Sequence, residues 1–105
     1  MRNYFLVFLA LCIGGAVHAE PTGARVNVIS LRPYASSTSA YLHVSSPALC
    51  GTEVFTIPLN EQGGKEMYAT ALTALVSNKQ IQLEVSNATG CTGWGTRLQS
   101  LFIYP

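Results

Sequence analysis

The apolar residues of this chain change their spacing once, and that change constrains the fold more than any other feature. Five segments predict β-strands, because short apolar runs or strict alternation of apolar and polar side chains fill 24–32, 40–45, 54–57, 81–85 and 98–104. Between the third and fourth, the spacing becomes that of an amphipathic helix over 65–77, with apolar residues at Tyr68, Ala71, Leu72, Leu75 and Val76. Asn78 suits its C-terminal cap. The predicted order is β-β-β-α-β-β, mainly β with one helix.

The first predicted strand contains a change of phase that favours a closed barrel. Val26 and Val28 share one face, and the apolar set then continues one residue later at Ile29 and Leu31. A one-residue slip is what a β-bulge produces, and it bends a long strand. Five strands, one of them bent, with a helix between the third and fourth predict an OB-fold-like barrel. The alternative is an open antiparallel sheet with the helix packed on one face. In the last strand, both faces are apolar enough to predict that 98–104 is largely covered.

The N-terminus has the pattern of a secretory signal peptide. Arg2 is followed by a short apolar run from Tyr4 to Ala16 and by small residues before a predicted cleavage site after Ala19. The run is too short to span a bilayer comfortably, so we expect no stable membrane insertion after cleavage. Removing 1–19 from the 105 residues leaves 86, which is enough for one OB-fold-like domain over 20–105. The predicted location is secreted or periplasmic.

Two cysteines remain after cleavage, Cys50 and Cys91, and they are predicted to form a disulfide, because an even cysteine count is typical of small exported proteins. Closing a loop of this length stabilises the fold by about 4 kcal/mol in the chain-entropy treatment. Two cysteines and one mature histidine cannot supply the usual four zinc ligands. We therefore expect no metal site and no cofactor.

The side-chain inventory argues against an enzyme and against nucleic-acid binding. The mature chain has no aspartate, and His43 is its one histidine, so a Ser-His-Asp or Cys-His arrangement cannot be assembled from it. Its four glutamates after the first mature residue, all in solvent-facing contexts, are Glu53, Glu61, Glu66 and Glu84. Positive and negative side chains cancel, whereas single-strand binding normally relies on a positively charged groove.

The candidate ligand-binding residues lie in two places. Tyr41, His43 and Ser45 point outward from the second predicted strand, and can form either a ligand-contacting stripe or ordinary sheet surface. Trp94 lies between two glycines in a loop that Cys91 would anchor, and it can serve either as a stacking platform for a sugar or a partner, or as a lid on one end of the barrel. The binding residues that we predict are Tyr41, His43, Thr92, Trp94 and Arg97.

From Cys50 onward, the chain resembles a group of small secreted bacterial proteins of unknown function. The matching pieces are Cys50-Gly51, Phe55 to Ile57, Met67 to Ala74, Lys79 to Leu83, Cys91 to Trp94 and Leu98 to Ile103. The layout is similar, more distantly, to the B subunits of AB5 toxins of the subtilase-cytotoxin type. That resemblance implies an OB-fold, a carbohydrate-binding role and a homo-oligomeric ring.

The sequence thus predicts a secreted, disulfide-stabilised, non-enzymatic binding module, similar to a toxin B subunit, whose partner is a glycan or a protein surface. The alternative is a periplasmic envelope or stress protein that binds a small ligand or inhibits another exported protein.

Overall fold

The computed structural model describes residues 23–105, so the predicted signal peptide, 1–19, lies outside the described residues. The described part contains, in chain order, β1 (Val26–Pro33), β2 (Ser39–Val44), β3 (Val54–Pro58), α2 (Gln62–Ser77), β4 (Gln80–Val85) and β5 (Thr96–Ile103). The predicted β-β-β-α-β-β order is confirmed, and no predicted bound is wrong by more than three residues.

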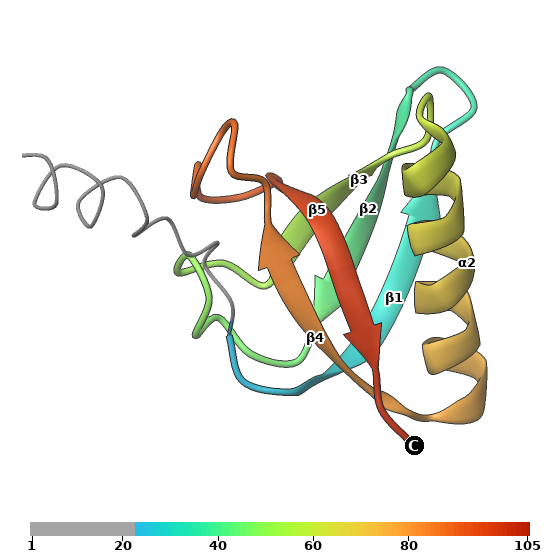
Figure 1. The fold of residues 1–105 in the computed structure, drawn as a ribbon, viewed down its shortest axis with the longest axis vertical. Helices are drawn as coiled ribbons and strands as arrows, with labels where there is room; N and C mark the ends of the chain where they lie inside the picture. Colours follow the sequence, from blue (N-terminus) through green and yellow to red (C-terminus); the bar gives the residue numbers. More distant parts are fainter. Residues whose placement is uncertain (1–22) are drawn as a thin grey trace, which may run out of the picture.

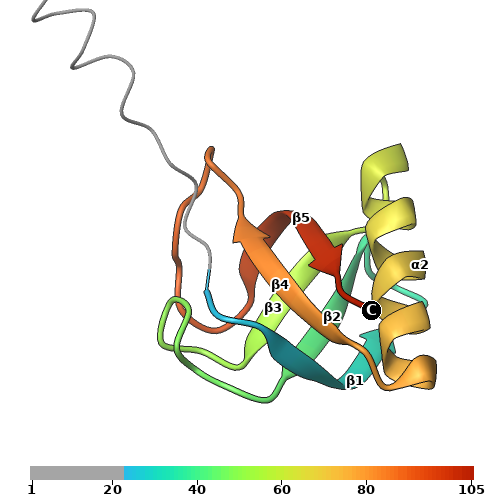
Figure 2. The ribbon, with the colours of Figure 1, turned by 60° about the horizontal axis from the view of Figure 1, so that its bottom comes forward.

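The strands form a closed, OB-fold-like barrel in the order β1-β2-β3-β5-β4, with β1 pairing β4 to complete the ring (Figure 1). Every neighbouring pair is antiparallel except β3 and β5, which run parallel through Phe55 with Thr96 and Thr56 with Arg97. The open-sheet alternative is therefore wrong. Helix α2 lies along one side of the barrel, and Figure 2 shows its axis beside the ends of β1 and β5.

The predicted bulge in β1 is confirmed, but its effect on one side chain differs from the prediction. The register between β1 and β2 shifts between Val28 and Ser30, while Val26 and Val28 are buried. Ile29 is the extra residue of the bulge and is 51% exposed, so the prediction that it continues the inward-facing set was wrong. Leu31, after the bulge, packs against the core as predicted.

The face that the helix buries overlaps the predicted one only in part: Ala71 is buried as predicted, and Tyr68 and Leu75 pack against the core. Its buried residues are Gly64, Met67, Ala71 and Ala74. Leu72 and Val76, which were predicted to face the core, are exposed, Val76 to 76%. The helix approaches the end of β3 so closely that a Cβ built on Gly64 would lie 1.6 Å from the Pro58 carbonyl oxygen. Apart from Met67, the buried residues of this face are therefore small. Asn78 caps the helix in the left-handed conformation, as predicted.

The second half of β5 is less covered than predicted. Leu98 is buried, but Phe102 is 47% exposed, and Ile103 is exposed as well. The reason is that β3 pairs with β5 only as far as Arg97, after which β5 has β4 as its one strand neighbour in the described part of the chain.

Candidate ligand-binding face

Two aromatic rings from distant parts of the sequence meet on the outer surface of the barrel. Tyr41 points outward from β2, while Ala40 and Leu42 on either side of it are fully buried. Trp94 comes from the loop 86–95 between β4 and β5, and its ring centroid lies 5.3 Å from that of Tyr41, with 36° between the ring planes. Tyr34 adds a third ring, edge-on to Tyr41, at 5.5 Å and 85°. We call Tyr34, Tyr41 and Trp94 the aromatic face.

Trp94 is held in place and yet stays open to solvent. It is 68% exposed, so it packs on the outside of the barrel instead of closing one end as a lid. Gly93 and Gly95 on either side have φ angles of 79° and 82°, in the region that favours glycine. Gly95 is fastened to β3, because its N–H donates to the Val54 carbonyl and its own carbonyl accepts from Thr56 Oγ1, each at 2.9 Å.

Thr96 and the disulfide fix the rest of this loop. The buried Thr96 hydroxyl donates to the Gly93 carbonyl at 2.6 Å and accepts from the Thr92 N–H at 3.0 Å. The predicted disulfide between Cys50 and Cys91 is confirmed, and it ties the loop to the turn between β2 and β3. These bonds fix the loop and so hold the Trp94 indole in position.

Polar groups surround the aromatic rings. The Arg32 guanidinium carbon lies 5.0 Å from the centroid of the Tyr34 ring, within range of a cation–π contact. His43 Nε2 lies 3.0 Å from Glu53 Oε1. Arg32, Tyr34, Tyr41, His43 and Trp94 line a cavity of about 160 Å³ that opens on the surface. The cavity offers a stacking surface, a cation and an imidazole that its carboxylate partner orients.

The structure brings together three of the five predicted binding residues, Tyr41, His43 and Trp94. Thr92 bonds within its own loop through Thr96 and does not line this cavity. The Ser45 hydroxyl, on the predicted outward stripe, accepts a hydrogen bond from the Asn27 N–H instead of joining the rings.

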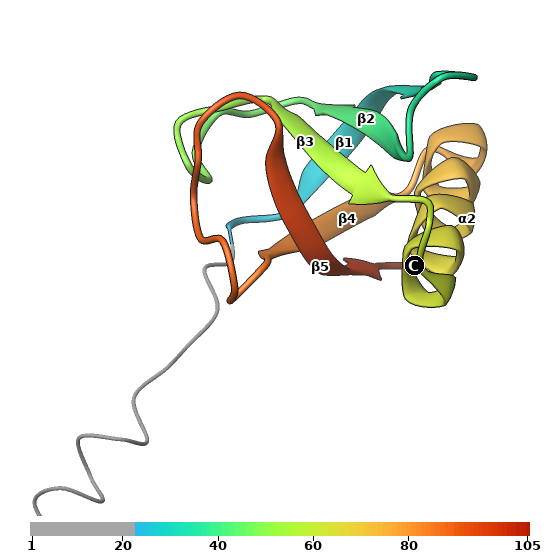
Figure 3. The same ribbon diagram turned by 90° about the horizontal axis from the view of Figure 1, so that it is seen from above.

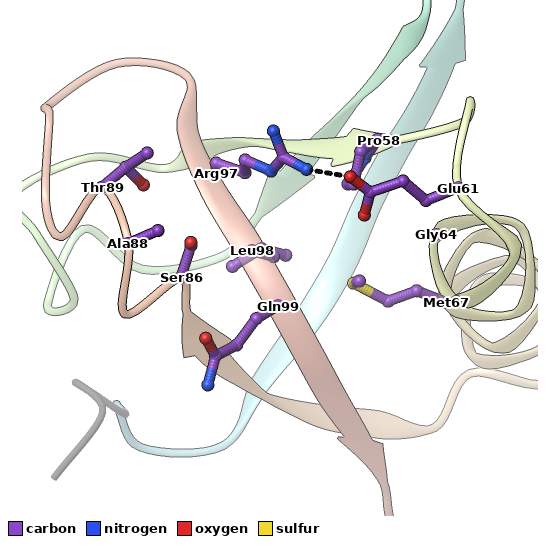
Figure 4. Close-up of a pocket in the computed structure, with 11 residues that line it drawn as sticks. Pro58, Glu61, Gly64, Met67, Ser86, Ala88, Thr89, Arg97, Leu98 and Gln99 are labelled. Carbon is purple, nitrogen blue, oxygen red and sulfur yellow. Dashed lines mark hydrogen bonds and ion pairs between the residues drawn. The ribbon is translucent and has the colours of Figure 1, made fainter.

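Arg97 lies at a different cavity, shown in Figure 4. Its guanidinium bonds the carboxylate of Glu61 across a hollow of about 300 Å³ between β5, the start of α2 and the loop at Ala88. Met67 and Leu98 supply apolar lining. The carboxylates of Glu53 and Glu61 are partly exposed, as the sequence predicted, and they contact His43 and Arg97 respectively.

The sequence reasoning missed Arg32 and Tyr34. Arg32 is the direct cross-strand partner of Tyr41, so it shares the outward face of the sheet. The pairing register of the first two strands would have identified it. Tyr34 follows β1 directly in a segment that its composition marks as a turn, which hid its ring contact with Tyr41.

Among residues 23–105, no three histidine, cysteine, aspartate or glutamate side chains gather as a metal site would require. No helix in the same range is long and apolar enough to cross a membrane. The chain matches no protein-family model, no curated protein and no solved structure. The resemblance to toxin B subunits and the homo-oligomer that it implies stay predictions.

Proposed function

We propose that this protein is an exported, non-enzymatic binding module that recognises carbohydrate through the aromatic face. The observation that carries the proposal is the pairing of Tyr41 with the exposed ring of Trp94 beside a cavity that also holds Arg32 and His43. The confirmed disulfide supports export, because such bonds persist in oxidising compartments.

The geometry suits a sugar ring. A pyranose has an apolar C–H face that packs on an aromatic ring and a rim of hydroxyl groups that need hydrogen-bond partners. Trp94 offers the first surface, while Arg32 supplies donors, and His43 supplies a donor or an acceptor. Because the disulfide and the bonds of Thr96 fix the loop before binding, little conformational entropy is lost when the ligand stacks.

A protein partner is the second candidate, and the composition of the same face favours it. Tryptophan, tyrosine and arginine are the residues that most often dominate binding energy at protein interfaces. Trp94, Tyr34 and Arg32 lie together here. An inhibitor of another exported protein would use them as anchors.

The experiment is a glycan-array screen of the oxidised mature protein beside two variants. Trp94→Ala removes the stacking ring, and Val76→Ala is the matched control, because Val76 is an exposed apolar residue on α2. We expect selective glycan binding by the wild type and by Val76→Ala, and at least a tenfold loss in Trp94→Ala, since stacking and apolar burial are both removed.

If none of the three folded proteins binds a glycan, the carbohydrate proposal is wrong, and the protein-partner candidate takes its place. If Trp94→Ala binds as well as the wild type, the protein binds sugar but not through the aromatic face.

A further inference from the structure

The second half of β5 is an open strand edge. In residues 23–105, β5 pairs with β3 only at Thr96 and Arg97, and from Leu98 onward it pairs with β4 alone. The Tyr104 N–H donates to the Gln80 carbonyl, so these two residues form a hydrogen-bonded pair of the antiparallel ladder. Hydrogen-bonded and non-hydrogen-bonded pairs alternate along such a ladder, so Leu101 and Ile103 are in non-hydrogen-bonded pairs with β4. The backbone groups of Leu101 and Ile103 consequently point away from β4, toward the side of α2.

A groove runs along this edge. The hollow of about 300 Å³ beside Arg97 adjoins a second of about 210 Å³, and the two share Gly63, Met67 and Gln99 in their lining. The second is bounded by Thr70 on the helix and by Leu101 on the strand. Figure 3 shows β5 passing α2 with no other strand between them. Several wall residues are small, which leaves room beside the strand.

The groove carries an excess of negative charge. The carboxylates in its lining are Glu61 and Glu66, both on the helix side, against one arginine. Arg97 is the one cation in the described lining, and Glu61 already binds it. A ligand with positive charge is therefore favoured here.

We propose that this groove binds an extended, basic peptide segment of a partner protein, which adds a strand to the free edge of β5. Main-chain hydrogen bonds to Leu101 and Ile103 provide the attachment, as in other strand-addition complexes. Lysine or arginine side chains on one face of the peptide meet Glu66, and an apolar side chain enters the hollow over Met67 and Leu98. The site is separate from the aromatic face and does not depend on the proposed carbohydrate binding.

The test is an NMR titration of the ¹⁵N-labelled mature protein at low salt with an acetylated, amidated nonapeptide of alternating lysine and valine. We expect saturable binding, shifts along β5 and the facing side of α2, and slower hydrogen exchange at the amides of Leu101 and Ile103. The same peptide with alternate backbone nitrogens methylated cannot form a ladder and should not bind.

Two protein variants test the charge and the location. Glu66→Gln should lower the affinity for the lysine–valine peptide by about threefold, which is the effect of one exposed ion pair. Trp94→Ala should leave the affinity for this peptide unchanged. A nonapeptide of alternating glutamate and valine should bind neither Glu66→Gln nor Trp94→Ala.

Three results would overturn the proposal. These are no binding of the lysine–valine peptide, equal binding of its methylated form, or shifts centred on Tyr41 and Trp94. Protection of Leu101 and Ile103 that grows with protein concentration in the absence of peptide would assign the edge to a second copy of this chain instead.

Discussion

At Gly64 the helix lies against the barrel with no room for a side chain. A Cβ at this position would lie 1.6 Å from the Pro58 carbonyl oxygen and 2.7 Å from its carbonyl carbon, so any other residue must push the helix away from β3. Gly63, one position earlier in the same helix turn, has no atom within 4 Å of an added Cβ. Two adjacent glycines therefore have opposite roles.

We predict that Gly64→Ala lowers the free energy of unfolding by about 3 kcal/mol, through overpacking against backbone that cannot move aside. Gly63→Ala should raise it by about 0.5 kcal/mol, because alanine loses less backbone entropy in a helix than glycine does. Urea unfolding followed by circular dichroism measures both. Equal effects of the two substitutions would mean that α2 does not sit against Pro58 as described.

At the scale of single elements, the disulfide and the Trp94 loop form one unit. Cys50 lies in the turn between β2 and β3, and Cys91 lies 41 residues later in the loop that carries Trp94. The bond thus holds the edge of the proposed site as well as the fold.

The double variant Cys50→Ser/Cys91→Ser should lose about 4 kcal/mol of stability, because the unfolded chain regains the entropy of a 41-residue loop. Under conditions where the variant stays folded, glycan affinity should fall too, since Trp94 must then be ordered on binding. Unfolding and binding are measured in parallel. A loss below about 1 kcal/mol with unchanged affinity would show that hydrogen bonds of Thr56 and Thr96 suffice to hold the loop.

The strands and the helix differ in how well the sequence alone predicts which of their side chains are buried. Alternation placed Ala40 and Leu42 inside and Tyr41 outside, because a strand has only two faces and one of them is buried. The helix was harder, because 3.6-residue spacing identifies an apolar stripe but not which side of it reaches the core. The close contact at Gly64 turns the helix so that Met67 and Ala74 are buried beside the predicted Ala71, while Leu72 and Val76 are exposed.

For the whole molecule, the element order and the bulge were sufficient to predict a closed barrel, and the cysteine count was sufficient to predict the disulfide. The closing contact was not predictable in detail, since the parallel pairing of β3 with β5 joins segments 41 residues apart, at Phe55 and Thr96. The same pairing brings Trp94 onto β2, so the union of Trp94 with Tyr41 became visible only in three dimensions. The pairing of β3 with β5 also places Arg97 at the hollow beside Glu61, away from Tyr41 and Trp94.

The aromatic face contains the one tryptophan of the whole chain, which gives a direct measurement of the central claim. Trp94 fluorescence is recorded while the wild-type protein is titrated with the glycan that binds most tightly on the array, and calorimetry gives the affinity independently. If sugar stacks on Trp94, its emission should shift to shorter wavelength and saturate with the calorimetric Kd, because a 68% exposed indole loses water on binding. Saturable calorimetric binding with unchanged Trp94 emission would contradict the assignment of this face as the binding site.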